Sequence, residues 1–320
     1  MNGALGHHHL ISVEQLSAAD VIQILDAAEA FFEISVRPVR KVPTLRGKTV
    51  INLFYEASTR TRSSFELAGK RLSADVINVS TSTSSVTKGE TLLDTCKTLQ
   101  AMHPDLVIIR HSASGAPLYV SKRLECGVVN AGDGAHEHPT QALLDAFVMR
   151  RSHGTLKGLK VAICGDIKHS RVARSNTLLL NLFGAEVRYC GPKTLIPRNA
   201  ESLGVKVYDR LEDALEGVDV IYLLRIQLER LQGAPLPSLR EYSRTFGVSH
   251  RHLPLAALNA IIMHPGPINR GVEIHPLLAD CEKSAILKQV EAGVAVRMAV
   301  LYLLMSGKGS ESLNEATGAD

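Results

Sequence analysis

Hydroxyl and guanidinium groups gather where an apolar run of the sequence gives way to an amphipathic one, at Ser58, Thr59, Arg60 and Thr61. The N-terminus of a helix offers unpaired backbone N–H groups and the positive end of the helix dipole, to which these side chains add further donors. Serine or threonine at such a place is commonly only a helix cap. Two arginines in the first turn, Arg60 and Arg62, oppose the dipole and do not serve capping. The spacing therefore favours a site for a phosphate group.

A second polar run, from His136 to Gln141, precedes an apolar helical stretch. Pro139 suits the first position of that helix, and a spacing of three places His138 and Gln141 on one face of its first turn. Both side chains can donate hydrogen bonds to a carbonyl group. His136 and His138 are also of the metal-ligand type, but no third ligand of matching spacing accompanies them, so we expect no metal site.

Arginines follow three other apolar runs. Arg110 ends the first of them. At this position the sequence is equally compatible with an arginine that reaches solvent and with one that binds a ligand. Arg171 and Arg174 follow the second run and Arg225 ends the third, and their guanidinium groups can hold carboxylates bidentately. The turn before Arg171 contains a single glycine, Gly165, and so lacks the GxGxxG pattern that a nicotinamide dinucleotide requires.

A Pro-Gly-Pro turn, Pro265 to Pro267, ends the apolar run 260–263 after His264. Such a turn presents backbone carbonyl groups that can accept hydrogen bonds from an amide. The tripeptide is also common in turns without any binding role.

An alternation of apolar and amphipathic runs predicts the elements that position these groups. Helices are expected at 63–72, where Phe65, Ala68 and Leu72 share a face, and at 172–183, before Gly184. Parallel strands joined by such crossover helices bind ligands beyond their carboxyl ends. We therefore predict an α/β fold of two domains, each a parallel β-sheet flanked by helices. The expected strands are 49–55, 75–79, 106–110, 128–130, 160–165, 186–190, 218–224 and 260–263.

The two series of strands are separated by a break in the apolar pattern at 150–158, which predicts a domain boundary. A last apolar helix, 289–305, can complete either domain, and periodicity does not decide which. Two long polar segments, 80–90 and 227–252, are equally compatible with solvated loops and with lids that complete a site.

The composition is that of a folded globular protein. Its 320 residues correspond to about two domains of roughly 150 residues. Hydrophobic residues make up 45% and charged residues 21%, which excludes a disordered polymer. A net charge of +4 is too small to indicate nucleic-acid binding, and 4% aromatic residues without tryptophan give no stacking platform for a single strand. No run of about 18 apolar residues predicts a membrane span.

Cysteine usage and the N-terminus indicate the compartment. The five cysteines are odd in number and form no CxxC pair, which favours neither a disulfide framework nor a zinc ribbon and indicates a reducing environment. The N-terminus lacks the basic and apolar segments of a secretory signal. These features predict a cytoplasmic protein. For His7–His9 we expect a disordered tail or a cloning remnant rather than a metal cluster, because no other ligand lies nearby in the sequence.

From about Leu10 to Ser306 the sequence resembles the catalytic chains of aspartate carbamoyltransferases, within the aspartate/ornithine carbamoyltransferase superfamily. Residues 54–66, Phe-Tyr-Glu-Ala-Ser-Thr-Arg-Thr-Arg-Ser-Ser-Phe-Glu, look like its carbamoyl phosphate signature. Ornithine enzymes typically carry His-Cys-Leu-Pro where this chain has His264-Pro265-Gly266-Pro267, and Ser-Met-Gly where it has Arg225-Ile226-Gln227. Gly266 departs from the usual His-Pro-Leu-Pro turn, but the family uses a backbone carbonyl there.

The resemblance implies roles for the residues of the first domain, expected to be the carbamoyl phosphate-binding domain (1–148, completed by the C-terminal helix at about 290–320). Arg110 would bridge the phosphate and the carbonyl group, and Thr61 and His138 would join it in polarising the carbonyl oxygen. Gln141 would fix the carbamoyl amino group together with the backbone of Gly266 and Pro267. The phosphate itself would be held by Ser58, Thr59, Arg60 and Thr61.

The resemblance also implies an aspartate-binding domain, 149–289, in which Arg171, Arg225 and Gln227 match the aspartate-binding positions. It implies an active site in the cleft between the two domains. Ser84 and Lys88 match a loop that enters the active site of the neighbouring subunit, where Lys88 also binds aspartate. A homotrimer with shared sites, or a dimer of trimers, is therefore expected. Whether the trimer pairs with a regulatory chain or with dihydroorotase is not readable from the sequence.

The implied activity is transfer of the carbamoyl group of carbamoyl phosphate to L-aspartate in pyrimidine biosynthesis. No cofactor, metal, nucleic acid or membrane is expected to take part. One alternative is a transferase for ornithine or an acetylated amino acid. Another is a non-catalytic homologue, whose expected signature is the loss of Arg60, Lys88, Arg110 or His138, all of which are present.

Overall fold

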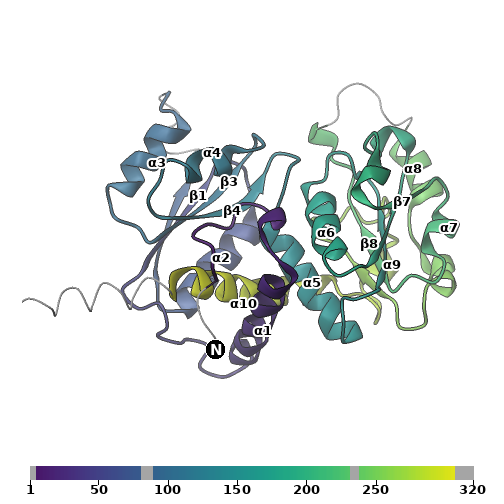
Figure 1. Ribbon diagram of the computed structural model, residues 1–320. Helices are drawn as coiled ribbons and strands as arrows, with labels where there is room; N and C mark the ends of the chain where they lie inside the picture. The colour runs from purple at the N-terminus through teal and green to yellow at the C-terminus, as the bar shows by residue number, and fades with distance from the viewer. Residues whose placement is uncertain (1–4, 81–88, 231–237, 307–320) are drawn as a thin grey trace, which may run out of the picture. The chain divides into compact units, whose positions relative to one another are not determined.

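The computed structural model describes residues 5–80, 89–230 and 238–306. Their contacts divide the chain into two compact units, here called unit 1 (residues up to Leu143 together with those from Ala292) and unit 2 (Leu144–Glu291). Each unit is built on a parallel sheet with helices packed against it (Figure 1). No helix within the described ranges is long and apolar enough to cross a membrane.

The sheet of unit 1 has the strand order β2-β1-β3-β4, and each neighbouring pair is parallel. Its strands are β1 (Thr49–Phe54), β2 (Asp75–Ser80), β3 (Leu106–His111) and β4 (Gly127–Asp133). Its helices are α1 (Ala18–Ser35), α2 (Thr59–Arg71), α3 (Leu92–Gln100), α4 (Ala116–Ser121) and the first turn of α5 (Pro139–His153). A short 3-10 helix, η1 (Val13–Gln15), precedes α1.

The helix predicted at 63–72 is confirmed, but it begins four residues earlier, at Thr59. Phe65, Ala68 and Leu72 are fully buried on its inner face. On the outer face Lys70 Nζ lies 2.6 Å from Glu66 Oε1, the pairing expected of residues four apart. The early start places the polar residues that precede Ser63 in the first turn of α2.

The expectation of a disordered N-terminal tail at His7–His9 is wrong for the described residues. β4 is the last strand of its sheet, and the chain before α1 pairs with its open edge. Leu10 N–H donates to Val128 O at 2.8 Å, and His9 Nδ1 accepts from Val128 N–H at 3.1 Å. His8 Nε2 lies 2.8 Å from Glu125 O. Backbone groups at a sheet edge need partners, and this segment supplies them.

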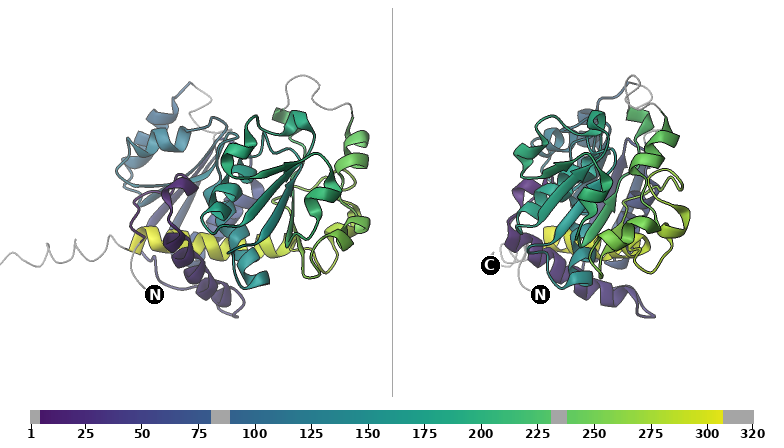
Figure 2. Two further views of the ribbon diagram at one scale, coloured as in Figure 1. Left: turned by 45° about the vertical axis from the view of Figure 1, so that its right-hand side comes forward. Right: turned by 90° about the vertical axis from the view of Figure 1, so that its right-hand side faces the viewer.

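The last helix, α10 (Ile286–Met305), passes from unit 2 into unit 1. In unit 1 it lies beside α1 (Figure 2). The rings of Tyr302 and Phe31 meet edge to face there, with their centres 5.7 Å apart. The Arg297 guanidinium stands 5.0 Å from the centre of the Phe65 ring on α2. Most of α10 therefore completes the core of unit 1. The helix is apolar on all sides, so its sequence did not reveal which of the two domains it completes.

The sheet of unit 2 has the order β7-β6-β5-β8-β9, again with parallel neighbours. Its strands are β5 (Lys160–Cys164), β6 (Glu186–Cys190), β7 (Lys206–Tyr208), β8 (Val220–Leu223) and β9 (Ile261–Met263). The remaining helices are α6 (Arg171–Asn181), α7 (Leu211–Leu215), α8 (Leu239–Phe246) and α9 (Pro276–Ala279), with 3-10 helices η4 (Lys193–Leu195), η5 (Ala200–Leu203), η6 (Leu228–Arg230) and η7 (His250–Leu255).

Two elements of unit 2 differ from the sequence expectation. The three-residue edge strand β7 is too short and too exposed to give an apolar run. The segment 227–252, for which solvated loops and lids were both open, contains α8. Tyr242 of α8 is buried against Leu195 and Ile226, and the partly buried Phe246 packs against the same cluster, so these two aromatic side chains hold the otherwise polar helix to the core.

Candidate active site

The carboxyl ends of β1, β3 and β4 meet at one edge of the unit 1 sheet. Phe54 pairs in register with Arg110, and His111 pairs with Asp133. The loops that follow these strands therefore leave the sheet side by side. They carry Ser58, Thr59, Arg60 and Thr61 after β1, and His138 and Gln141 after β4, while Arg110 is at the end of β3 itself.

The start of α2 has the features of an anion site. Ser58 occupies the N-cap position with extended backbone, yet its side chain makes no capping hydrogen bond, and the first turn contains no acidic residue. Thr61 is buried, whereas Thr59 and Arg60 are exposed. The first-turn N–H groups of a helix have no intrahelical acceptor, so they and the hydroxyls can converge on a bound oxyanion.

Arg110 is held by two protein acceptors rather than extended into solvent. Its Nη2 donates to Glu56 Oε1 at 3.0 Å, and its Nη1 donates to the carbonyl oxygen of Ala131 at 3.2 Å. Only 11% of the side chain is exposed. The guanidinium is thereby held between the ends of β1 and β4.

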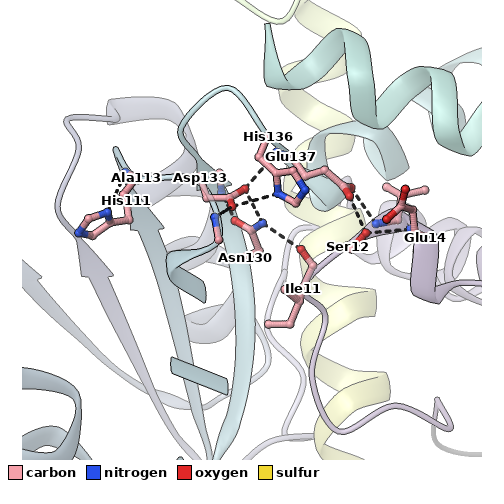
Figure 3. A network of polar contacts seen from close by, with 12 residues as sticks. Ile11, Ser12, Glu14, His111, Ala113, Asn130, Asp133, His136 and Glu137 are labelled. Carbon is pink, nitrogen blue, oxygen red and sulfur yellow. Dashed lines mark hydrogen bonds and ion pairs between the residues drawn. The ribbon is translucent and has the colours of Figure 1, made fainter. Parts of the chain in front are cut away.

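Asp133 organises the loop that leads into α5 (Figure 3). Its Oδ1 accepts from Asn130 Nδ2 at 2.9 Å and from the N–H of Glu137 at 3.0 Å. Its Oδ2 accepts from the N–H of Gly115 at 2.6 Å and lies 3.1 Å from His136 Nδ1. His136 thus pairs with a carboxylate, and no group of three metal-binding side chains occurs among the residues that the structure covers.

Glu137, directly before His138, ties this loop to the N-terminal segment (Figure 3). Its side chain is fully buried, with Oε1 accepting from Ser12 Oγ at 2.5 Å and Oε2 from the N–H of Val13 at 2.8 Å. Neither Asp133 nor Glu137 belongs to a motif that is evident from the sequence alone. The available signal was the Asp133-Gly134 pair, which is typical of a tight turn.

In unit 2, the loops after β5 and β8 pack closely together. Gly165 has φ +131°, and a Cβ at this position would lie 2.3 Å from the carbonyl oxygen of Leu224. The glycine of this turn therefore serves loop packing. Asp166, fully buried, accepts from the N–H of Gln227 at 3.1 Å through Oδ2, and its Oδ1 lies 2.8 Å from His169 Nδ1.

Three of the four residues predicted to bind aspartate lie at this edge; the fourth, Lys88, is outside the described residues. Arg171 begins α6 directly after the β5 loop and is 5% exposed. Arg225 and Gln227 follow β8, the neighbouring strand, and both are partly exposed. Two guanidinium groups and an amide at adjacent strand ends provide the donors that a dicarboxylate requires.

The turn after β9 contains backbone carbonyl oxygens that are available as hydrogen-bond acceptors. The N–H of His264 donates to Gln289 Oε1 at 2.8 Å, and that of Gly266 donates to His264 Nδ1 at 2.8 Å. Pro265 and Pro267 have no N–H group. Within the described residues, no donor reaches the carbonyl oxygens of Gly266 and Pro267. Gly266 adopts φ +67°, a left-handed conformation that favours glycine.

Ser84 and Lys88 lie outside the described residues. The other predicted site residues are distributed over the two sheet edges. Those of unit 1 are Ser58, Thr59, Arg60, Thr61, Arg110, His138 and Gln141, and those of unit 2 are Arg171, Arg225, Gln227, Gly266 and Pro267.

Comparison with known families accounts for both units. Residues 8–151 match the model of the aspartate/ornithine carbamoyltransferase carbamoyl-P binding domain, and residues 157–304 match that of the Asp/Orn binding domain. The chain belongs to the aspartate/ornithine carbamoyltransferase family. The resemblance seen in the sequence is confirmed, as is the prediction of two parallel-sheet α/β domains.

Similar members of the family include curated aspartate carbamoyltransferase catalytic subunits. That of Sorangium cellulosum is 66% identical over 298 residues, 93% of each chain. That of Syntrophotalea carbinolica is 59% identical over 308 residues, 96% of this chain and 98% of the relative.

Solved structures of the family have the same fold. The aspartate transcarbamoylase of Trypanosoma cruzi in complex with carbamoyl phosphate and aspartate is 30% identical, with a TM-score of 0.84 over 92% of this chain and 96% of that one. The catalytic subunit from M. jannaschii is 35% identical, with a TM-score of 0.83 over 95% of this chain and 100% of that one.

Proposed function

We propose that this protein transfers the carbamoyl group of carbamoyl phosphate to the α-amino group of L-aspartate, giving N-carbamoyl-L-aspartate and phosphate. The observation that carries the proposal is the sheet edge of unit 1, where Arg110 is clamped between Glu56 and Ala131 at the strand end next to the start of α2. The names of the related catalytic subunits support it.

In the proposed reaction the phosphate group binds at the start of α2. Ser58, Thr59 and Arg60 hold it through hydroxyl groups, N-terminal N–H groups and a guanidinium. These donors match an anion whose charge is spread over several oxygens.

The carbonyl oxygen of carbamoyl phosphate becomes an oxyanion when the amine attacks. Thr61, Arg110 and His138 are the proposed donors to it. One preorganised donor of this kind contributes about 3 kcal/mol to transition-state stabilisation. The fixed guanidinium of Arg110 suits this role because it needs no reorganisation during the reaction.

The carbamoyl amino group is proposed to contact Gln141 and the carbonyl oxygens of Gly266 and Pro267. Aspartate is proposed to bind through Arg171, Arg225 and Gln227, because its two carboxylates need cationic donors that an ornithine side chain does not. The proposed carbamoyl phosphate-binding domain is 1–148, completed by the C-terminal helix at about 290–320, and the proposed aspartate-binding domain is 149–289.

The chemistry requires no covalent enzyme intermediate. The neutral α-amino group attacks the carbonyl carbon, the tetrahedral intermediate collapses, and the C–O bond to phosphate breaks. The departing phosphate dianion can accept the amine proton, so no side chain is needed as a base. Catalysis then rests on positioning and on charge stabilisation.

The proposal includes a cytoplasmic homotrimer acting in pyrimidine biosynthesis. Ser84 and Lys88 are proposed to enter the site of the neighbouring subunit. Mixing inactive Arg60→Ala chains with inactive Lys88→Ala chains should then restore partial activity, because some mixed sites contain neither change. No recovery after confirmed subunit exchange would contradict shared sites.

A steady-state assay tests the reaction itself. Carbamoyl phosphate is supplied with aspartate, ornithine or N-acetylornithine, and we expect product only from aspartate. Arg60→Ala should lower turnover about 10³-fold through loss of phosphate donors, whereas Lys70→Ala, which removes an exposed charge from the other end of α2, should not. Turnover with ornithine alone would identify a different acceptor, and no turnover with any acceptor would favour a non-catalytic homologue.

A further inference from the structure

A chain of buried polar side chains supports the Pro-Gly-Pro turn from within unit 2. Gln289 of α10 donates from Nε2 to Asp145 Oδ1 at 2.7 Å, and its Oε1 accepts the N–H of His264 at 2.8 Å. Asp145 is fully buried, and Gln289 and His264 are 3% and 2% exposed. Such groups are costly to bury unless their hydrogen bonds are satisfied. The hydrogen bonds among them therefore restrict the side chains to this arrangement.

The Asp145 carboxylate determines which way Gln289 points. A carboxylate only accepts, so the Gln289 amide must turn its NH2 group toward Asp145 and its oxygen toward the turn. The other oxygen of Asp145 accepts from Tyr222 OH at 2.6 Å and from Asn176 Nδ2 at 2.8 Å. Three donors from three different elements thus fix the carboxylate, and the carboxylate fixes the amide.

On the other side, His264 and Glu273 complete the support of the turn. His264 Nδ1 accepts the N–H of Gly266, so the ring proton is on Nε2, which lies 3.1 Å from Glu273 Oε1. The same Glu273 oxygen accepts the N–H of Asn269 at 2.6 Å. Each of the N–H groups of residues 264, 266 and 269 is bound to a side chain, which leaves the carbonyl oxygens of Gly266 and Pro267 for a ligand.

We propose that Asp145 and Gln289 are positioning residues for recognition of the carbamoyl amino group. They act through the backbone of His264, holding the turn so that its carbonyl oxygens face the N–H groups of the substrate. This inference rests on the proposed function. It predicts that the pair contributes to discrimination between carbamoyl phosphate and acetyl phosphate, in which a methyl group replaces the amino group.

Polarity-swap variants test the proposal. Asp145→Asn places an amide opposite the NH2 group of Gln289, and Gln289→Glu places a second carboxylate opposite Asp145. Each single change therefore disrupts the hydrogen bond between positions 289 and 145. We expect each single change to lower kcat/KM for carbamoyl phosphate by about 10- to 100-fold, as is typical for residues that orient a contacting group. The kcat/KM for acetyl phosphate should fall less, so the ratio of the two should decrease.

The double variant Asp145→Asn/Gln289→Glu should restore the ratio. The new amide oxygen at 145 can accept from Tyr222 and Asn176, its NH2 group can donate to the new carboxylate at 289, and that carboxylate can accept the N–H of His264. Glu291→Gln, an exposed carboxylate-to-amide change on the same helix, is the matched control and should leave the ratio unchanged.

Several outcomes would overturn the proposal. Equal loss of activity with both acyl phosphates in the single variants would show a purely structural role, and so would a double variant that folds but does not recover the ratio. If a single variant does not fold, the double variant and Glu273→Gln, which keeps the acceptor for Asn269, carry the same comparison. A wild-type enzyme that fails to use carbamoyl phosphate would instead reject the proposed function.

Discussion

Arg110 Nη2 lies 3.0 Å from Glu56 Oε1, so the guanidinium at the end of β3 is held by a carboxylate at the end of β1. A second hydrogen bond, to Ala131 O, fixes its plane. The orientation of Arg110 therefore depends on a fork of donors that lysine does not possess.

Arg110→Lys tests this geometry. The ammonium group keeps the positive charge but cannot serve both acceptors and the substrate, so we expect kcat to fall about 10²- to 10³-fold. Arg123→Lys, a change at an exposed arginine of the same unit, is the control for steady-state kinetics. Unchanged kcat in Arg110→Lys would show that the fork is dispensable.

Asp166→Asn tests the contact between the β5 and β8 loops. The carboxylate accepts the N–H of Gln227 and pairs with His169, and an amide can satisfy only part of this arrangement. We expect the KM for aspartate to rise about tenfold, from a loss of about 1–2 kcal/mol, with the KM for carbamoyl phosphate little changed.

Asp219→Asn is the matched control for that experiment. Asp219 accepts the N–H of Lys160 at 2.8 Å, at the opposite end of the same strands. Equal effects of the two substitutions on the aspartate KM would argue against a specific role of Asp166.

Glu137→Ala tests the tie between α5 and the N-terminal segment. The change leaves the N–H of Val13 and the hydroxyl of Ser12 without their charged acceptor. We expect unit 1 to lose about 3 kcal/mol of unfolding free energy, measured by urea denaturation. Glu33→Ala, at an exposed position on α1, should have little effect. A similar midpoint in both variants would contradict a supporting role for Glu137.

His111 gives a pH dependence of stability. Burial lowers the pKa of His111 below its usual value of 6.5, and its Nδ1 accepts the N–H of Ala113 at 2.9 Å. The unfolded chain then binds a proton more readily than the folded one, so the free energy of unfolding decreases as the pH falls below about 6.5.

His111→Asn retains an acceptor but does not titrate. In urea denaturation between pH 5 and 8, the stability of the wild type relative to this variant should therefore decrease as the pH falls. An NMR titration that places the pKa of His111 at or above 6.5 would refute this explanation.

Features that depend on neighbouring residues can be predicted from the sequence, whereas contacts between residues far apart in the chain cannot. The bounds of β6 are predictable because Gly184 and Gly191 enclose a short run of alternating polar and apolar residues, and the polar start of α2 is evident from adjacent residues. The tie from Glu137 to Ser12 spans 125 positions, and that from Asp145 to Gln289 spans 144. Periodicity shows which face of an element is buried but not which distant side chain meets it.

The same limit applies to Gly165 and α8. A single glycine in a turn did not reveal its close approach to Leu224, which belongs to another strand's loop. In α8 the burial of Tyr242 depends on contacts with η4 and with the residues after β8, so the composition of the segment alone does not reveal it.

The division of the chain between the units has a consequence for its biosynthesis. Unit 2 is continuous, whereas unit 1 needs the stretch from Ala292, which a ribosome produces after unit 2. Domains usually complete their folding in the order of synthesis. In this chain unit 1 cannot complete its core until α10 has been synthesised, because Tyr302 packs against Phe31 and Arg297 against Phe65. A nascent chain stopped before Ala292 should therefore carry a protease-resistant second half and a protease-sensitive first half.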